Sequence, residues 1–191
     1  MRSLFIILLF ILQYELFSQR IESFPTYHKY LPKRFSKDSN IFFIAFLDLS
    51  AKGIKQRIPV VYSLFHYSID SSYFTIKGDN IDNFSFLVSD KKAQPLYKKD
   101  ALKLPKDYEV FLRTAKKKFQ EFKREGDLRR YFRFYSEPDW LQDDKTPFSA
   151  NGKPMRFICQ IELLRITDDD CTLYIFYDEQ KKIVKHIIQR T

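Results

Sequence analysis

Glycine is scarce in this 191-residue sequence, which contains only four. Such scarcity argues against the glycine-rich loops that cradle phosphate groups, and neither the GxGxxG nor the P-loop pattern occurs. Histidine is scarce too, and His28, His66 and His186 form no HxH or HExxH pair, so a metal site lacks support. His66 lies in an aromatic stretch, where we expect a hydrogen-bonded core histidine. We therefore expect no bound cofactor.

Cysteine occurs twice, at Cys159 and Cys171, without the CxxC spacing of zinc and redox sites. If a hairpin turn centres on residues 167–170, Cys171 begins the second strand while Cys159 lies deep in the first. The two residues would then lie several residue pairs apart, beyond the roughly 7 Å Cα separation that a disulfide allows. We expect two small buried side chains rather than a disulfide.

No stretch of the sequence reaches the roughly 20 apolar residues of a membrane-spanning helix. The unbroken apolar run at residues 4–12 follows Arg2 and precedes the small residue Ser18. A basic start, a short apolar stretch and a small residue of this kind are typical of a secretory signal peptide. We predict cleavage after Ser18 and export to the periplasm or the extracellular space, with no transmembrane segment in the mature chain.

Acidic residues are too few to balance the basic ones, and the formal net charge is +9. Residues 91–133 account for all of this excess, with fifteen Lys or Arg against six Asp or Glu. The candidate basic patch in this segment consists of Arg113, Lys116, Lys117, Lys118, Arg129 and Arg130. It could bind a polyanion, nucleic acid or an anionic surface. Because charge runs are usually solvated faces, we do not expect nucleic acid to be the partner.

Aromatic and β-branched residues, in contrast, are abundant and predict a sheet. Four strands joined by short turns are predicted to form an antiparallel meander, at residues 41–49, 58–69, 73–77 and 84–88. Four more are predicted at residues 129–135, 155–164, 171–177 and 183–188. The last of these would be an edge strand, because its lysines discourage further pairing. Residues 19–40, with two prolines and mixed charge, are predicted to be a loose lead.

One long helix is predicted between Pro105, which suits a first helical position, and Gly126, which suits an end. Its apolar residues recur at the helical period and form one stripe, Tyr108, Phe111, Leu112, Ala115, Phe119 and Phe122. Such a helix can lie on a membrane surface or a partner, but beside a sheet we prefer a core face. The predicted fold is a single α+β domain at residues 41–191, a mostly antiparallel sheet with one helix, after a signal peptide at residues 1–18.

The acidic residues form no clear catalytic set, so an enzyme is not the favoured prediction. Paired carboxylates such as Asp143 and Asp144 could act as acid and base or bind calcium. Neighbouring residues of an extended chain point to opposite sides, which makes these two poor partners. Residues 168–170 are three aspartates of the kind found in hairpin turns.

Trp140, the only tryptophan, lies between Pro138 and Pro147. A single tryptophan in a loop can anchor a bound partner. It can equally be a plug that closes the end of the sheet, with Gln142 and Gln160 hydrogen-bonded to the loop backbone beneath it. We prefer the plug, because Gln160 interrupts an apolar strand and a buried amide needs hydrogen-bond partners.

The same region resembles a known family. The matching residues are Pro138, Trp140, Gln142, Asp144, Pro147, residues 152–155, Phe157, Gln160, Ile161 and residues 173–176. Their order is similar to the C-terminal half of the YwqG-like family, a bacterial family with no assigned biochemical function. It is also similar to the programmed-cell-death-2-like proteins, which act as chaperones for a ribosomal protein. The resemblance covers roughly 40 of the 191 residues and implies a sheet-rich α+β fold without an established active site.

The favoured function is an exported, non-enzymatic module that binds a protein or peptide. Its candidate binding residues are Trp140, Gln142, Asp144 and Gln160. The first alternative is a polyanion or an anionic surface bound through the basic patch. An enzyme that uses Asp143 or Asp144, and an immunity-type protein encoded beside a toxin gene, are further alternatives.

Overall fold

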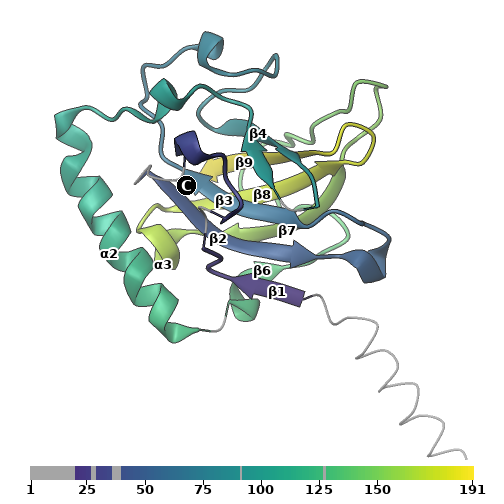
Figure 1. The fold of residues 1–191 in the computed structure, drawn as a ribbon, viewed down its shortest axis with the longest axis horizontal. Helices are drawn as coiled ribbons and strands as arrows, with labels where there is room; N and C mark the ends of the chain where they lie inside the picture. Colours follow the sequence, from purple (N-terminus) through teal and green to yellow (C-terminus); the bar gives the residue numbers. More distant parts are fainter. Residues whose placement is uncertain (1–19, 27–28, 36–39, 91, 127) are drawn as a thin grey trace, which may run out of the picture.

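The structure, a computed structural model, describes residues 20–26, 29–35, 40–90, 92–126 and 128–191 (Figure 1). The predicted signal peptide and His28 lie outside these residues. Within them the chain forms a sheet of order β1-β2-β3, a second sheet of order β5-β4-β9-β8-β7-β6, and one long helix. All strand pairs in both sheets are antiparallel. The predicted α+β class is confirmed.

The three-stranded sheet consists of β1 (Arg20–Ser23), β2 (Ile41–Asp48) and β3 (Ile58–Ser63). β2 and β3 confirm two predicted strands, although β3 ends earlier than predicted. β1 lies in the segment predicted to be a loose lead, so that prediction is wrong for residues 20–23, which pair with β2. Since β2 is almost wholly buried, its backbone polar groups need a strand on each side.

The six-stranded sheet is built from the later part of the chain. Its strands are β4 (Asn83–Val88), β5 (Ala93–Pro95), β6 (Phe132–Arg133), β7 (Arg156–Glu162), β8 (Cys171–Asp178) and β9 (Ile183–Arg190). The predicted meander is wrong, because β4 joins this sheet instead of pairing next to β3. The strand predicted at residues 73–77 is also wrong: η4 (Ser71–Tyr73) is a 3-10 helix, and Phe74 makes only an isolated bridge to Tyr97.

Two further strand predictions fail around the second sheet. β9 is not an edge strand, since it lies between β4 and β8. Its Lys185 does not keep other strands away but forms an ion pair with Asp79. Residues 129–135 contain only the two residues of β6, because the 3-10 helix η7 (Arg129–Tyr131) comes first.

The connections include one long helix, and the remaining helical pieces are short. α2 (Glu109–Glu125) is entered through η6 (Lys106–Tyr108) and ends at Gly126, whose φ of 77° suits glycine. Between β7 and β8, α3 (Leu164–Thr167) precedes the aspartates predicted to form the turn. The other 3-10 helices are η2 (Lys33–Phe35), η3 (Ser50–Lys52) and η5 (Lys99–Leu102).

The predicted core stripe is confirmed for its later residues, whereas Phe111 and Leu112 are only partly buried and Tyr108 precedes α2, outside the core. Ala115, Phe119 and Phe122 are buried, and the Phe119 ring centroid lies 5.2 Å from that of Phe42 on β2. Figure 1 shows α2 beside α3 at one end of the sheets. The helix therefore closes one end of the core and leaves its basic residues on the outer face.

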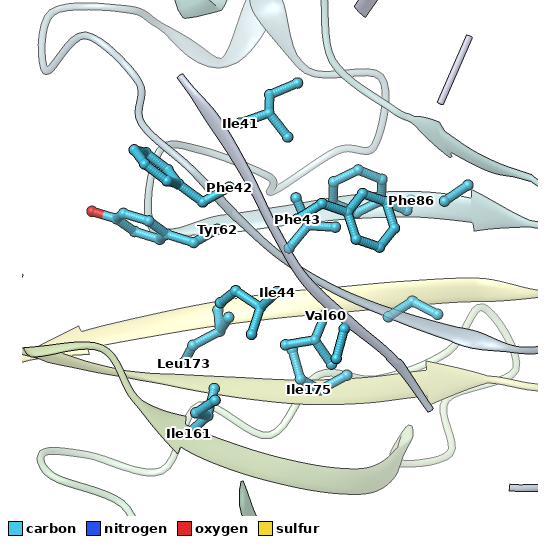
Figure 2. Packing of buried hydrophobic residues seen from close by; sticks show 14 of the residues in the cluster. Ile41, Phe42, Phe43, Ile44, Val60, Tyr62, Phe86, Ile161, Leu173 and Ile175 are labelled. Carbon is cyan, nitrogen blue, oxygen red and sulfur yellow. The ribbon is translucent and has the colours of Figure 1, made fainter. Parts of the chain in front are cut away.

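The two sheets pack against each other, and the side chains between them make the main core. Figure 2 shows Ile44 and Val60 of the three-stranded sheet directed toward Leu173 and Ile175 of the six-stranded sheet. All four are fully buried. The outer edge of β3 also reaches β9, where His186 Nε2 lies 3.2 Å from a β3 carbonyl oxygen. A polar contact therefore joins the sheets in addition to apolar packing.

Cys159 on β7 and Cys171 on β8 are both buried, which confirms the prediction for their burial. In the β7–β8 register Cys159 is opposite Ile175, well along β8 from Cys171, and both thiols are free. Burial raises the pKa of each thiol, so both remain protonated. Among the helices of the described residues, none has the length and apolar character that crossing a membrane requires.

Candidate functional site

The loop that contains Trp140 lies on the outer face of the six-stranded sheet. The Trp140 ring centroid is 4.5 Å from that of Tyr174 and 5.8 Å from that of Phe176, both on β8. Met155 and Ile187 complete this small apolar cluster, which is separate from the main core. Trp140 therefore covers apolar side chains of its own sheet instead of projecting toward a partner.

Buried polar groups beneath the loop hold its backbone. Gln160 accepts a hydrogen bond from the Asp139 N–H at 2.8 Å and donates one to the Asp139 carbonyl at 3.4 Å, which confirms the predicted brace. The Tyr174 hydroxyl donates to the same carbonyl at 2.8 Å and accepts from the Leu141 N–H at 3.0 Å. Both polar atoms of the Gln160 side chain are thus used within the loop.

Gln142 and Asp144 are also occupied by contacts within the loop or with the end of β9. The Gln142 side chain donates to the Arg190 carbonyl at the end of β9, at 2.9 Å, and not to the loop backbone as predicted. The backbone N–H of Gln142 donates to the side-chain oxygen of Gln189 at 3.1 Å. Asp144 accepts a hydrogen bond from the Thr146 N–H at 2.7 Å, which lowers the pKa of its carboxyl group. The four candidate binding residues therefore share one loop-and-sheet assembly, and the contacts described above hold the loop on the sheet.

Replacing Trp140 tests this plug. We expect Trp140→Ala to lower the free energy of unfolding by about 1–2 kcal/mol, below the 3–5 kcal/mol typical of a fully buried tryptophan, because its ring is only partly buried. Urea denaturation followed by circular dichroism measures the change. The neighbouring exposed Leu141→Ala is the matched control, and equal stabilities of the two variants would contradict the plug.

The residues of the basic patch lie on α2 and η7, and several already have acidic partners. Lys118 Nζ is 3.0 Å from a carboxylate oxygen of Asp168, so it ties α2 to the β7–β8 connection. Arg130 pairs with Glu125 at 2.8 Å, and Lys117 lies 3.9 Å from Glu121. The remaining members are Arg113, Lys116 and Arg129, of which Arg129 lines a separate hollow with Arg20 and Glu22. The patch is therefore partly neutralised and is divided between two elements.

A cleft of about 470 Å³ opens where the end of β3, the start of α2 and the end of β9 meet. Its tyrosine and charged residues define what we name the tyrosine cleft: Tyr62, Tyr67, Asp107, Tyr108, Asp169 and Arg190. Leu64, Phe65 and Phe111 supply apolar lining. The residues come from distant parts of the sequence, and only the fold brings them together.

A network of charged groups forms the inner part of the tyrosine cleft. The Tyr62 hydroxyl donates to the Asp169 carboxylate, and Arg190 pairs with Asp82 and, at 3.8 Å, with Asp169. Burial, together with the neighbouring Asp169, raises the pKa of Tyr62, so the phenol stays neutral. Burial opposes the charge of Arg190, but its hydrogen bond to Asp82 and the negative charges of Asp82 and Asp169 raise its pKa. The guanidinium is thus fixed between two acids.

Two stacked tyrosines form the rim. Tyr67 is 63% exposed, and its ring lies 5.9 Å from that of Tyr108 with an interplanar angle of 25°. The His66 ring lies 4.6 Å from the Tyr67 ring, and its Nδ1 is 2.5 Å from the Ser68 hydroxyl oxygen. His66 is therefore at the cleft rim, beyond β3, and its predicted role as a core histidine is wrong. The core histidine is His186, which is fully buried on β9.

The tyrosine cleft is acidic although the chain has a formal net charge of +9. Its ionised lining groups are the two carboxylates of Asp107 and Asp169 and the guanidinium of Arg190. Asp82 adds a third carboxylate to the same network. Across the described part of the chain, no group of three or more His, Cys, Asp and Glu residues is arranged to hold a metal ion.

The sequence did not indicate this cleft. Asp169 is predicted to be a turn residue, Tyr108 a member of the core stripe, and Tyr67 part of a strand. No spacing links the three, because each follows the end or precedes the start of a different element. The one usable signal is the concentration of tyrosine and histidine just after β3, where an exposed aromatic residue has no structural requirement.

No protein-family model, curated protein or solved structure matches this chain. The resemblance to the YwqG-like family therefore stays a prediction, carried by the residues between Pro138 and residue 176 alone. The arrangement of the tyrosine cleft and the Trp140 loop is the remaining basis for a function.

Proposed function

We propose that this protein is an exported binding protein, not an enzyme, and that it captures a peptide segment in the tyrosine cleft. The observation that carries the proposal is the stacked pair of exposed Tyr67 and half-buried Tyr108 above an acidic interior. Export rests on the predicted signal peptide. The proposal keeps the binding function favoured by the sequence but moves it away from Trp140.

The size and lining of the cleft support a peptide ligand. A volume of about 470 Å³ is in the range of pockets that enclose small ligands or a few side chains. Tyrosine is favoured at recognition surfaces because it offers a large rigid area and a hydroxyl group with few rotatable bonds. Leu64, Phe65 and Phe111 offer apolar contact beneath the rim.

The charge of the cleft supports a basic side chain in that peptide. Asp107 is exposed at the rim and has no cationic partner among the described residues. A lysine or arginine beside Asp107 could also lie over the faces of Tyr67 and Tyr108, which attract cations. We therefore commit to a segment with one basic residue between apolar residues.

The chemistry of the cleft supports binding over catalysis. Tyr62 is a neutral phenol, and the carboxylate of Asp169 is occupied by Tyr62 and Arg190. The nearby Cys171 thiol is protonated because burial raises its pKa, so it is a poor nucleophile. This set of residues lacks the paired nucleophile and base of covalent catalysis.

Binding of defined peptide pools tests the proposal. Three heptapeptide pools would differ only at the central residue, which is arginine, glutamine or glutamate between apolar residues. We expect the arginine pool to bind most tightly in fluorescence anisotropy. Tyr67→Ala and Asp107→Asn should each weaken the affinity for this pool about tenfold, the equivalent of about 1.4 kcal/mol. Both residues are surface-accessible, so the variants should fold.

The matched control is Phe148→Ala, which removes another exposed aromatic side chain, 65% exposed, from a distant loop. It should leave peptide affinity unchanged. Equal binding of the three pools, or equal loss in the Phe148 variant, would remove the peptide proposal. Preference for the glutamate pool would instead point to the basic patch.

A further inference from the structure

A second hollow, of about 380 Å³, lies between η3 and the start of β7. Its polar lining consists of Lys52, Tyr135, Ser136 and Arg156, and we name it the Lys52–Arg156 hollow. From its geometry we infer that this hollow binds a phosphate monoester, with the two cations on the phosphate and the two hydroxyls as further hydrogen-bond donors. The site shares no residue with the tyrosine cleft and does not depend on the peptide proposal.

Local structure holds the two cations side by side. Lys52 is the last residue of η3, which ends at Gly53 with a φ of 80°. Arg156 is the first residue of β7, and its guanidinium donates a hydrogen bond to the Lys52 carbonyl oxygen at 3.2 Å. This bond fixes the guanidinium next to the lysine, although the two residues are far apart in the sequence.

The two cations share their hollow with no acidic residue of the described chain. Burial, followed by the charge of Arg156, lowers the pKa of Lys52. The Lys52 ammonium lies over the Phe134 ring, 5.9 Å from its centroid. Two like charges at a partly desolvated position repel each other, and a bound anion would remove this cost.

Three other cations of this protein have carboxylate partners. Arg57 pairs with Glu22, Lys185 with Asp79, and Arg190 with Asp82. Lys52 and Arg156, in contrast, are both exposed and no carboxylate of the described residues lines their hollow, so an anion from solution can reach both charges.

A phosphate monoester fits the charge and shape of the hollow. It carries about −1.5 to −2 charge at neutral pH, which matches two cations, whereas a carboxylate would neutralise only one. The planar guanidinium of Arg156 can bind two phosphate oxygens at once. Leu49, Ile54 and Phe157 add an apolar wall that could contact the organic group of the ester.

Titration calorimetry with inorganic phosphate, phenyl phosphate and benzoate tests the inference on the full chain. We expect 1:1 binding of both phosphates and tighter binding of phenyl phosphate, since its ring can reach the apolar wall. Benzoate should bind at least tenfold more weakly. Equal affinity for inorganic and phenyl phosphate would assign the site to free phosphate rather than to an ester.

Lys52→Gln and Arg156→Gln should each weaken phenyl phosphate binding at least tenfold, and the affinity should fall with added sodium chloride. The control Lys145→Gln removes an exposed lysine elsewhere and should have no effect. Circular dichroism would confirm that the variants are folded. Absence of saturable phosphate binding to the unmodified protein, or undiminished binding to both glutamine variants, would overturn the inference.

Discussion

Lys185→Met is expected to lower the free energy of unfolding by about 3–5 kcal/mol, the usual cost of removing one partner from a buried ion pair. Lys185 Nζ lies 2.8 Å from Oδ1 of Asp79, whose side chain is 0% exposed, against 12% for Lys185. The second carboxylate oxygen of Asp79 is buried without a hydrogen-bond partner in the described structure. Without Lys185, the carboxylate of Asp79 would stay buried with no ion pair at Oδ1 and no hydrogen bond at Oδ2.

The loss of unfolding free energy caused by Lys185→Met should become smaller as the pH falls. Burial raises the pKa of Asp79 above its usual 3.8, although Lys185 opposes this shift. An acid whose pKa is raised on folding stabilises the fold fully below its unfolded pKa, and this stabilisation is lost as the pH rises through the folded pKa. Without Lys185 the folded pKa rises further, so the penalty should be largest near neutral pH and smallest near pH 4.

A double variant separates the ion pair from simple packing. Asp79→Asn combined with Lys185→Met removes both charges, and it should recover part of the stability lost in the single variant. Lys181→Met, at an exposed site in the turn before β9, is the matched control. If Lys185→Met falls within about 0.5 kcal/mol of that control in urea denaturation, the buried pair does not stabilise the fold as argued.

The elements whose pattern is local were predictable from the sequence. The stripe from Phe111 to Phe122 predicts α2 because each side chain one turn apart meets the same core. The dense runs of apolar and aromatic residues at 155–164 and 171–177 likewise predict β7 and β8. In these segments the sequence pattern and the burial agree, and the structure confirms them.

The division into two sheets was not predictable, because it depends on contacts between distant segments. Short connections made a single meander the simplest prediction, yet β4 pairs with β9, about a hundred residues later in the chain. The lysines of β9 suggested an edge strand, but Lys185 finds an acid at Asp79 and so tolerates a central position. The acidic partner of Lys185, and not the presence of lysine in the strand, therefore determines whether β9 can lie inside the sheet.

The candidate site was predictable only in part. The Gln160 brace followed from one rule, that a buried amide needs hydrogen-bond partners, and the structure bears it out. The tyrosine cleft had no such rule, because Tyr67, Tyr108 and Asp169 approach each other only after the helix and both sheets are in place. Sites assembled from the ends of separate elements leave no spacing in the sequence.

The second large effect is expected at His186. Lowering the pH from 7 to 5 should reduce the free energy of unfolding by about 2 kcal/mol through this residue alone. Burial lowers the pKa of His186 from 6.5 to about 3 in the folded protein. A base whose pKa is lowered on folding binds a proton more readily in the unfolded chain. Its contribution to stability is therefore complete above pH 6.5 and is lost as the pH falls.

The surroundings of His186 explain why it stays neutral. Its ring stacks on Phe84 at 5.3 Å and meets Phe86 at 5.0 Å, and its Nε2 contacts the β3 backbone at Pro59 and Val61. A protonated ring would carry a charge between the two sheets, where its contacts among the described residues are aromatic rings and backbone groups. Acid should therefore weaken the contact between β9 and β3 before it affects the Trp140 loop.

His186→Gln tests this account, since glutamine keeps a hydrogen-bonding side chain but does not titrate. The variant can be less stable than the unmodified protein at pH 7, so the informative quantity is the change in unfolding free energy between pH 7 and pH 5. We expect that change to be about 2 kcal/mol smaller in the variant. His66 lies at the cleft rim and is present in both proteins, so its contribution cancels in the comparison. If the change in unfolding free energy between pH 7 and pH 5 is the same in His186→Gln as in the unmodified protein, His186 is not the acid-sensitive group of the fold.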